Sequence, residues 1–358
     1  MKKIKPIAFY LPQYHPIPEN DVWWGKGFTE WTNVAKARPL FTGHWQPRLP
    51  ADFGFYDLRV SEVRQAQAQL AAQYGIHGFC YWHYWFGNGK RLLERPFNEV
   101  LESGTPDFPF CLAWANETWT GIWHGAPNKV LIEQTYPGIE DYKDHFYSVL
   151  QAFKDERYIK VDGKPVFLIY RPYNFNFSVF LELWHELALN EGLPGIHFIA
   201  VSEDSNLLQN GFSGLVFNAP SITMNSILNR KIKNKTFLQR LFNNEQESLL
   251  KVVDYTDYVN EIVKQKSDFP HYPLLLPGWD NTPRANNRGY VLLNSTPEVF
   301  RKLCSHCVQK SSQLESSEQF VFIKSWNEWA EGNYMEPDSK FGHDYLKVFK
   351  EELDKSVL

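Results

Sequence analysis

The sequence has few cysteines and no excess of positive charge. Four cysteines in 358 residues are far too few for a fold held together by disulfides. Lys and Arg number 37 against 41 Asp and Glu, which gives a formal net charge of −4, whereas general nucleic-acid binders are basic. We therefore expect neither a disulfide scaffold nor a nucleic-acid partner.

Long apolar runs are also missing. No uncharged apolar stretch reaches the roughly 18 residues that a transmembrane helix needs. The apolar run near the N-terminus is short, ends at Leu11 and is not followed by a cleavage site of small residues, so no secretory signal is expected. The prediction is a cytoplasmic protein, in which Cys80, Cys111, Cys304 and Cys307 stay reduced.

The motifs that would indicate a cofactor or a metal are incomplete. Gly87–Lys90 lacks the rest of either nucleotide-binding fingerprint, and no Asp-x-Asp pair follows a predicted strand. Cys304–Cys307 is a single Cys-x-x-Cys pair, whereas a zinc site needs a second pair of ligands. The Gly-x-Ser-x-Gly elbow of serine hydrolases does not occur. We expect no cofactor and no metal.

Aromatic residues, in contrast, are abundant, with 13 Trp, 18 Tyr and 27 Phe. Eight short runs, nearly continuous in apolar residues, have the pattern of strands buried on both faces. These runs are 6–11, 78–85, 108–115, 165–170, 196–201, 214–218, 273–276 and 320–325. Helical stripes lie between them, at 63–74, 139–153, 180–190, 255–265, 297–311 and 345–353.

The alternation of strands with helices implies βαβ units and a parallel sheet. Eight strands predict an α/β fold of the closed (β/α)8 type, the TIM barrel, with about 250 core residues. An open doubly wound sheet is the alternative, but it usually carries a Gly-rich turn after its first strand, where this chain has Pro12–His15. Because no repeat or linker is found, we expect residues 1–358 to form a single catalytic domain with loop insertions at 16–57 and 221–251.

The second insertion, 221–251, is basic. Interleaved apolar residues would make it amphipathic as a helix, and it holds Arg230, Lys231, Lys233, Lys235 and Arg240 with no acid among them. One interpretation is a solvated helix that covers the pocket. The other is contact with an anionic surface, either the inner membrane or a phosphate-bearing lipid carrier of the glycan, which would make the protein peripheral at the membrane.

The ends of the predicted strands carry aromatic and polar residues that a core does not need. In a barrel, the carboxyl ends of the strands form the active site. Aromatic rings stack on the C–H faces of sugars, and polar side chains bond sugar hydroxyls, so the pattern predicts a carbohydrate site. The alternative is that the aromatics fill a large core. The predicted substrate-binding residues are Tyr10, Tyr14, His15, Trp24, Glu30, Trp31, Tyr81, Trp82, His83, Tyr84, Trp114, Asn116, Glu117, Trp119, Tyr170, Trp279, Asp280, Trp326, Asn327, Trp329 and Glu336.

The strongest motif is the pair Glu328 and Glu331. Glycosidic cleavage needs one carboxyl group as acid and a second as base or nucleophile, and two carboxylates close together push their pKa values apart. A tight turn at the end of the last strand would aim both into the pocket, so we predict that they are the catalytic residues. Glu336 could support either of them, and Glu117 and Glu30 are further candidates.

Several segments resemble the WbsX proteins, namely Tyr10–Asn20, Trp23–Val34 and Trp114–Glu117. WbsX proteins are encoded among bacterial O-antigen and surface-polysaccharide genes and are commonly labelled glycosyltransferases, and the resemblance covers nearly the whole chain. They are similar in turn to the endo-α-mannosidases of glycoside hydrolase family 99, which are (β/α)8 barrels. That second resemblance is strongest at Asn327–Gly332 and at Glu336.

The resemblance to the mannosidases implies roles for the two carboxylates. Glu328 would take the proton of the sugar's 2-hydroxyl, which acts as an internal nucleophile. Glu331 would be the general acid and then the base toward water, with net retention of configuration. The chain departs from these enzymes at Ala330, where they usually have His, and from WbsX proteins at Thr118 and Gly121, where Asn and Arg are more frequent. These departures affect the rim of the pocket, and so the substrate more than the chemistry.

Three functions are compatible with these features. The first is a carbohydrate-active enzyme that acts on α-glycosidic bonds of a bacterial surface polysaccharide or oligosaccharide with retaining, hydrolase-like chemistry. The second is a glycosyltransferase of O-antigen or lipopolysaccharide biosynthesis. The third is a non-catalytic glycan-binding protein, which explains the aromatic residues but not the carboxylate pair.

Overall fold

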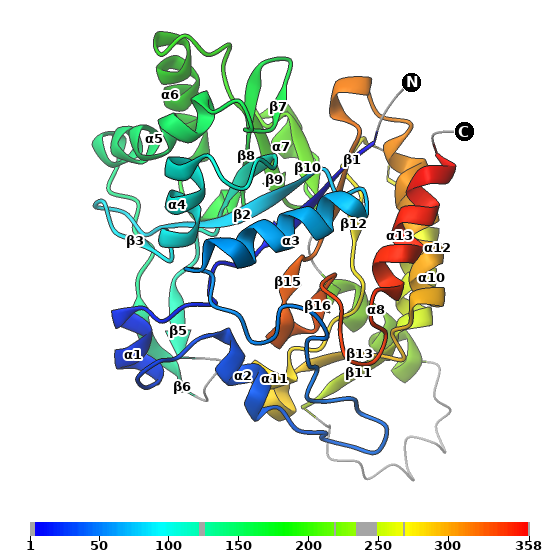
Figure 1. The fold of residues 1–358 in the computed structure, drawn as a ribbon. Coiled ribbons are helices and arrows are strands. Elements are labelled where there is room, and N and C mark those ends of the chain that lie inside the picture. Colours follow the sequence, from blue (N-terminus) through cyan, green and yellow to red (C-terminus); the bar gives the residue numbers. More distant parts are fainter. Residues whose placement is uncertain (1–3, 122–125, 218–219, 234–248, 268, 357–358) are drawn as a thin grey trace.

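Figure 1 shows the computed structural model, which describes residues 4–121, 126–217, 220–233, 249–267 and 269–356. Eight parallel strands form a barrel in the order β10-β9-β8-β4-β2-β1-β14-β12. These strands are β1 (Lys5–Tyr10), β2 (Gly78–Trp85), β4 (Phe110–Trp114), β8 (Lys164–Ile169), β9 (His197–Val201), β10 (Gly214–Val216), β12 (Leu274–Leu275) and β14 (Phe320–Ile323). The predicted (β/α)8 fold is confirmed, and all eight predicted runs contribute a strand.

The barrel closes between the outermost strands, β10 and β12. Val216, the last residue of β10, forms a parallel bridge with Tyr272, which precedes β12 by two residues. The backbone N–H of Tyr272 donates to the carbonyl of Leu215 at 2.8 Å. The first and last strands, β1 and β14, pair in parallel from Lys5 with Phe320 onward. The sheet is therefore nearly a closed ring with one short seam.

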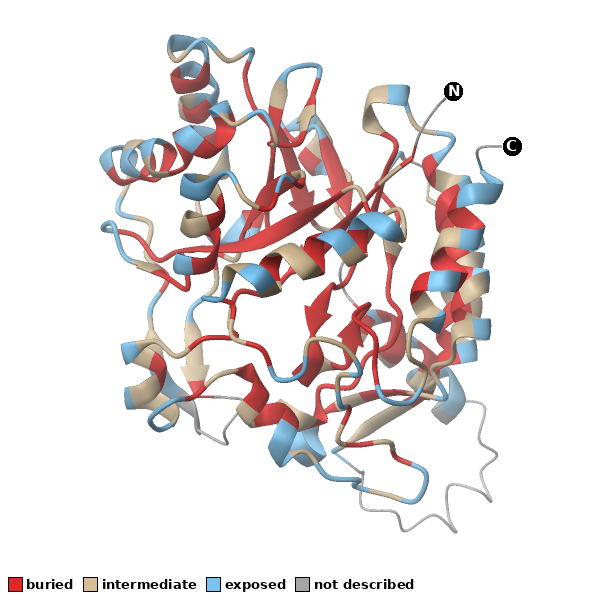
Figure 2. Cartoon of the chain, in the orientation of Figure 1, coloured by how far each residue is buried: buried red, intermediate tan, exposed pale blue. Residues whose placement is uncertain are grey.

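Burial on both faces explains why the strand sequences are continuously apolar. Every residue of β2 and of β4 is buried, as expected for a barrel strand covered by helices outside and by side chains inside. Within the barrel, the ring of Phe9 stacks on that of Trp82 with centroids 4.8 Å apart. Figure 2 shows the buried strands enclosed by helices whose outer faces are exposed.

The predicted helical stripes form the outer layer. They correspond to α3 (Ser61–Gln73), α5 (Ile139–Lys154), α6 (Phe177–Asn190), α10 (Tyr255–Lys264), α12 (Pro297–Ser311) and α13 (Asp344–Lys355). Side-chain caps fix three of the starts, and Asn176 accepts from the backbone N–H of Val179 at α6. The Thr296 side chain accepts from the backbone N–H of Val299 at α12, and that of Asp254 accepts from Thr256 at α10.

Shorter helices and strands surround the barrel. The remaining helices are α1 (Pro18–Trp24), α2 (Glu30–Lys36), α4 (Arg95–Ser103), α7 (Asn206–Gln209), α8 (Pro220–Lys233), α11 (Thr282–Ala285) and the 3-10 turns η2 (Pro172–Asn174), η3 (Asn286–Arg288), η4 (Ser316–Glu318) and η5 (Trp329–Glu331). The remaining strands are β3 (Arg91–Leu92), β5 (Trp119–Gly121), β6 (Ala126–Ile132), β7 (Lys160–Val161), β11 (Lys251–Asp254), β13 (Tyr290–Leu293), β15 (Asn327–Glu328) and β16 (Asn333–Tyr334). In Figure 1, α1, α2, β5, β6 and α11 gather at the lower end, toward which β1 runs from the N-terminus.

The second insertion begins with the helix α8. Two of its predicted cations pair with carboxylates of α10, Arg230 with Glu261 at 2.6 Å and Lys231 with Asp257 at 2.6 Å. Lys235 and Arg240, and the rest of 234–248, lie outside the described residues. No helix among the residues that are described has the length and apolar character required to cross a membrane.

Candidate active site

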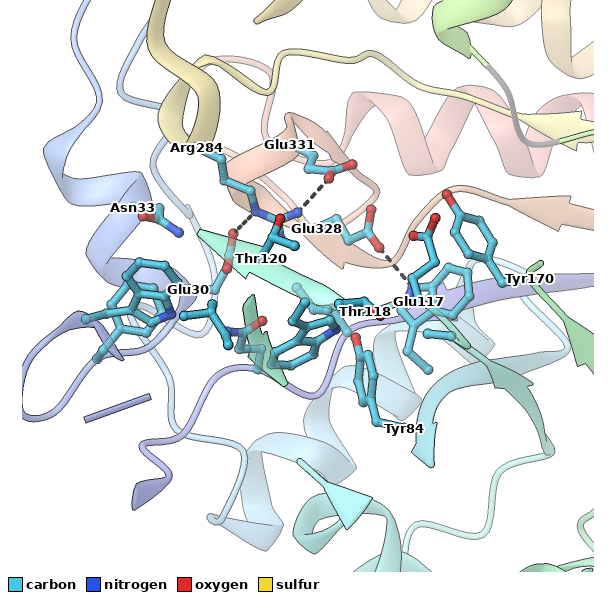
Figure 3. Close-up of a pocket in the computed structure, with 18 of the residues that line it drawn as sticks. Glu30, Asn33, Tyr84, Glu117, Thr118, Thr120, Tyr170, Arg284, Glu328 and Glu331 are labelled. Atoms are coloured by element: carbon cyan, nitrogen blue, oxygen red, sulfur yellow. Dashed lines mark hydrogen bonds and ion pairs between the residues drawn. The ribbon is translucent and has the colours of Figure 1, made fainter. Parts of the chain in front are cut away.

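A cavity of about 500 Å³ opens where the barrel strands end. Its wall combines β2, the first insertion, the loops that follow β4 and β8, and the segment after β14 (Figure 3). Nine residues predicted from the sequence line it: Trp24, Glu30, Trp82, Tyr84, Glu117, Trp119, Tyr170, Glu328 and Glu331. The other lining residues are Leu11, Gln13, Phe28, Asn33, Ala115, Thr118, Thr120, Leu131, Asn174, Arg284 and Lys324.

The predicted catalytic pair is carried by one turn that follows β14. The short strands β15 and β16 pair antiparallel and are joined by η5. Gly332 ends η5 with a φ of 61°, and a Cβ at that position would lie 2.9 Å from the Cβ of Asp280, so the tight turn requires glycine. Glu328 and Glu331 both line the cavity, while their catalytic role stays a prediction.

Two cations face the carboxylates of the cavity. Arg284 lies between two of them, as Figure 3 shows, with Nε 2.6 Å from Glu30 Oε1 and Nη1 2.5 Å from Glu331 Oε1. Lys324 Nζ lies 3.8 Å from Glu328 Oε2 and 3.7 Å from Glu331 Oε2. Glu30, Arg284 and Lys324 therefore form one connected network of charges with the pair.

The network shifts the pKa values of the pair in opposite directions. Burial raises the pKa of Glu328 above its ordinary value, and the attraction of Lys324 only partly offsets this. Burial also opposes ionisation of Glu331, but Arg284 and Lys324 outweigh it and lower the pKa of Glu331 to about 2. In the free cavity Glu331 is therefore the anion of the pair, and Glu328 is the carboxyl that holds a proton more readily.

Aromatic rings form the walls around the pair. The ring of Trp82 meets that of Tyr170 edge-on, with centroids 5.6 Å apart, and Tyr84 meets Trp119 in the same way at 5.1 Å. The indole N–H of Trp82 also donates to Glu328 Oε1 at 2.9 Å. The wall thus offers apolar surface for the C–H faces of a sugar and orients one of the two carboxylates.

Other predicted residues hold the turn from behind. The buried carboxylate of Glu336 accepts from Tyr56 Oη at 2.9 Å, from Gln67 Nε2 at 2.6 Å and from Trp329 Nε1 at 2.6 Å. Tyr14 Oη donates to the carbonyl of Asn327 and also lies 3.2 Å from the backbone N–H of Trp329, which donates to it. These residues anchor the turn and do not line the cavity.

Asp280 supports the same turn from its other side. Its buried carboxylate accepts from His44 Nε2 and Gln46 Nε2, each at 2.8 Å, and from Thr282 Oγ1 at 2.6 Å. Its backbone N–H donates to the carbonyl of Glu331 at 2.7 Å. Because Asp280 is fully engaged by protein groups, it fixes the position of Glu331 and leaves the cavity to other side chains.

Strand alternation explains why some predicted residues lie away from the cavity. On β2, Trp82 and Tyr84 face the cavity, so Tyr81 and His83 face the helices. Tyr81 packs against Phe97 of α4, and His83 Nε2 lies 2.9 Å from that of His145 in α5. Tyr10 also lies outside the lining and donates a hydrogen bond to Gln67 of α3. The other predicted residues outside the lining are His15, Trp31, Trp114, Asn116, Trp279 and Trp326.

Arg284 and Lys324 are the two charged residues among the lining residues that sequence reasoning missed. Lys324 is the one charged residue in the apolar run 320–326, and an isolated charge at a buried strand end was a usable signal. Arg284 lies in the short helix α11, between Pro283 and Ala285, with no local pattern that marks it. Among the described residues, no group of three or more His, Cys, Asp and Glu could hold a metal ion.

Titration of Glu336 provides a test of these anchors. Burial raises the pKa of Glu336 from 4.5 to about 7. A carboxyl with a raised folded-state pKa contributes stability that is present below pH 4.5 and is lost as the pH rises through 7. We expect the free energy of unfolding of the wild type to fall by about 3 kcal/mol over that window through this group, and urea unfolding of Glu336→Gln to lack that fall.

The free energies of unfolding of the wild type and of Glu336→Gln are compared at each pH, because the two proteins share every other titrating group. The matched control is Glu140→Gln, which changes a carboxyl whose side chain is 85% exposed on α5. A pH dependence in Glu336→Gln equal to that of the wild type would show that Glu336 does not titrate in this window.

Fold and cavity together define the class of the molecule, a (β/α)8 barrel with aromatic residues and paired carboxylates where its strands end. Residues 6–349 match the model of the family described as glycosyltransferase WbsX, and the chain belongs to that family. Two curated relatives from strains of Xanthomonas campestris pv. campestris, each called uncharacterized protein WxcX, are 38% identical over 355 residues. The match covers 98% of this chain and 50% of each relative, so the chain spans about half their length.

Solved structures share the fold. The GH99 endo-alpha-mannosidase from Bacteroides thetaiotaomicron aligns with a TM-score of 0.56 and 13% identity in its complex with Bis-Tris propane, covering 98% of this chain and 97% of that one. A second structure of the same enzyme aligns with a TM-score of 0.55 and 14% identity, covering 98% of each chain. A glycoside hydrolase-like protein aligns with a TM-score of 0.59 and 15% identity, covering 99% of this chain and 94% of that one. The WbsX resemblance seen in the sequence is confirmed, and the resemblance to the mannosidases is confirmed for the fold. The family description supports a carbohydrate-active enzyme.

Proposed function

We propose that the protein breaks or transfers α-glycosidic bonds of a bacterial surface polysaccharide or oligosaccharide through Glu328 and Glu331, with retention of configuration. The observation that carries the proposal is the pair itself. Buried Glu328 and partly buried Glu331 lie on one turn and line an aromatic-walled cavity, and their pKa values are shifted in opposite directions. Such a pair supplies a proton donor and an anion at one pH.

The charges of the free cavity bear on which carboxyl donates the proton. Glu328 has a raised pKa and one oxygen without a hydrogen-bond partner, which favours it as the acid, whereas Glu331 is held as an anion by Arg284. The resemblance to the mannosidases implies the reverse assignment. Aryl glycosides with good leaving groups distinguish the two assignments. Because such a leaving group needs no protonation, the variant that lacks the acid keeps its activity on them and the other variant does not.

Synthesis from a nucleotide sugar is the second candidate function, and the family description favours it. The charges of the cavity favour the first candidate, which breaks or transfers glycosidic bonds without a nucleotide sugar. Each of its cations, Arg284 and Lys324, faces two carboxylates, which would repel the diphosphate of a nucleotide sugar. A glycan-binding protein without catalysis is the third candidate, and it predicts unchanged behaviour when either carboxyl is neutralised.

Product NMR tests these candidates. The protein is incubated with α-linked mannans, α-linked rhamnans and the polysaccharide of the bacterium that encodes it, with and without nucleotide sugars. Cleavage or transfer without a nucleotide, with retained anomeric configuration, supports the proposal. A glycan that grows only when a nucleotide sugar is present overturns it in favour of the second candidate.

A further inference from the structure

A second cavity, of about 310 Å³, lies between two outer helices and the seam of the barrel. Its walls come from α10, from α12 and from the segment that leads into β12 (Figure 1). Its volume is within the range of small-molecule pockets, and none of the described residues that line it lines the cavity of the candidate active site. Among its lining residues are Phe217, Tyr258, His271, Leu274, His306 and Lys310.

Aromatic rings form one wall of this second cavity. Phe217 directly follows β10, and His271 directly precedes Tyr272, whose bridge to β10 closes the barrel. The rings of Phe217 and His271 are stacked, with centroids 4.3 Å apart and planes 8° from parallel, and Phe269 packs edge-on against Phe217 at 5.8 Å. Rings in this arrangement offer a flat apolar surface to a planar ligand.

Basic side chains gather in the same cavity. His306 and Lys310 are four residues apart and so share a face of α12. Burial lowers the pKa of His271 and that of His306, and the charge of Lys310 lowers both further. The three side chains therefore lie close enough to repel one another when they are charged. The carbonyl end of α12 favours a lysine in its last turn, but it does not explain the two imidazoles beside that lysine.

No acid compensates this basic cluster within the described part of the chain. The side chains of His306 and Lys310 form neither an ion pair nor a hydrogen bond with any described residue, whereas Arg301 of the same helix pairs with acids of α13. Glu203 also lines the cavity, but its charge acts on Tyr258 of α10 and on neither imidazole. An anion in the cavity would remove the mutual repulsion and would accept from donors that the protein does not use.

We propose that this second cavity binds a phosphate monoester carried on a planar ring, as in a nucleoside monophosphate. The ring lies along the stack of Phe217 and His271, and the phosphate accepts hydrogen bonds from His306 and Lys310. Phosphate suits these donors because lysine binds it as a point charge, whereas the fork of an arginine matches a planar carboxylate. No described arginine lines the cavity. The proposal does not depend on the catalytic pair or on the proposed function.

Calorimetric titration tests this site. The probes are uridine 5′-monophosphate and adenosine 5′-monophosphate, with the two nucleosides and inorganic phosphate as partial ligands. We expect at least one monophosphate to bind the wild type, and its nucleoside and inorganic phosphate to bind about 10-fold more weakly or worse. Lys310→Met should weaken binding of that monophosphate about 10- to 100-fold, and Phe217→Leu should weaken it about 5-fold or more.

Controls place the ligand and separate a lost contact from a lost fold. Lys302→Met removes another lysine of α12, which bonds Asn260 of α10, and should bind the monophosphate as the wild type does. The imidazole C–H signals of His271 and His306, assigned with His271→Gln and His306→Gln, should shift in the NMR spectrum of the wild type when the monophosphate is added. These signals report on the site even if Lys310→Met does not fold.

Three outcomes would overturn the proposal. The first is that neither monophosphate binds the wild type. The second is that a folded Lys310→Met binds as tightly as the wild type. The third is binding that leaves the signals of His271 and His306 unshifted, because the ligand would then lie elsewhere on the molecule.

Discussion

Replacing Glu331 by glutamine is expected to lower kcat by about 10²- to 10⁴-fold while the fold is kept. Glutamine has nearly the same shape, but it can neither give up a proton nor carry the negative charge. Arg284 keeps its ion pair with Glu30, so the cavity retains its wall. The measurement is the rate of product formation by NMR with the glycan that the wild type cleaves, together with a circular dichroism spectrum of each protein.

The matched control for that variant is again Glu140→Gln, which alters an exposed carboxyl on an outer helix and should turn over as fast as the wild type. Full activity in Glu331→Gln would show that the pair is not the catalytic machinery.

Replacing Arg284 by methionine is expected to lower the free energy of unfolding by about 3–5 kcal/mol at neutral pH. The guanidinium side chain is 14% exposed and bonds both Glu30 and Glu331. Without it, buried Glu30 loses the cation it bonds, and partly buried Glu331 keeps Lys324 as its nearby cation. Urea unfolding monitored by tryptophan fluorescence measures the loss.

The destabilisation by Arg284→Met should depend on pH. The pKa of Glu331 is lowered from 4.5 to about 2, chiefly by Arg284 against the cost of burial. A carboxyl with a lowered folded-state pKa contributes stability that is present above pH 4.5 and is lost as the pH falls toward 2. Through Glu331 this amounts to about 3 kcal/mol, so the gap between wild type and variant should narrow in acid.

Arg230→Met is the control for that series. Arg230 pairs with Glu261 on the surface and its side chain is 54% exposed, so its loss should cost less than about 1 kcal/mol at every pH. A gap between wild type and Arg284→Met that stays constant from pH 7 down to pH 2 would show that Glu331 is not held as an anion by Arg284.

The barrel could be predicted because each strand is buried on both faces. Such a strand reads as an apolar run that needs no partner to be recognised, and the run 78–85 became β2 with the same bounds. The short strands β15 and β16 could not be predicted in this way. They exist because Gly332 permits the tight turn between them, and their pairing depends on contacts with distant segments.

The candidate site was predictable where side chains sit on the turn itself and less so on the strands. Glu328 and Glu331 were marked by the motif alone, and both line the cavity. On β2 the sequence Tyr81–Tyr84 offers four aromatic or imidazole side chains in a row, and only every second one can face inward. Whether the odd- or the even-numbered residues face the cavity depends on how the strand lies in the barrel. The sequence of a single strand does not reveal this.

The contacts that hold the turn join parts of the chain that are far apart in sequence. Tyr56 reaches Glu336, Glu30 reaches Arg284, and β1 pairs with β14. During synthesis on the ribosome, strands from β2 to β9 can meet their neighbours early, because those pairings are more local. The cavity, in contrast, is completed only when the segment through Glu336 has emerged. A nascent chain arrested before that point would carry most of the barrel strands and an incomplete cavity.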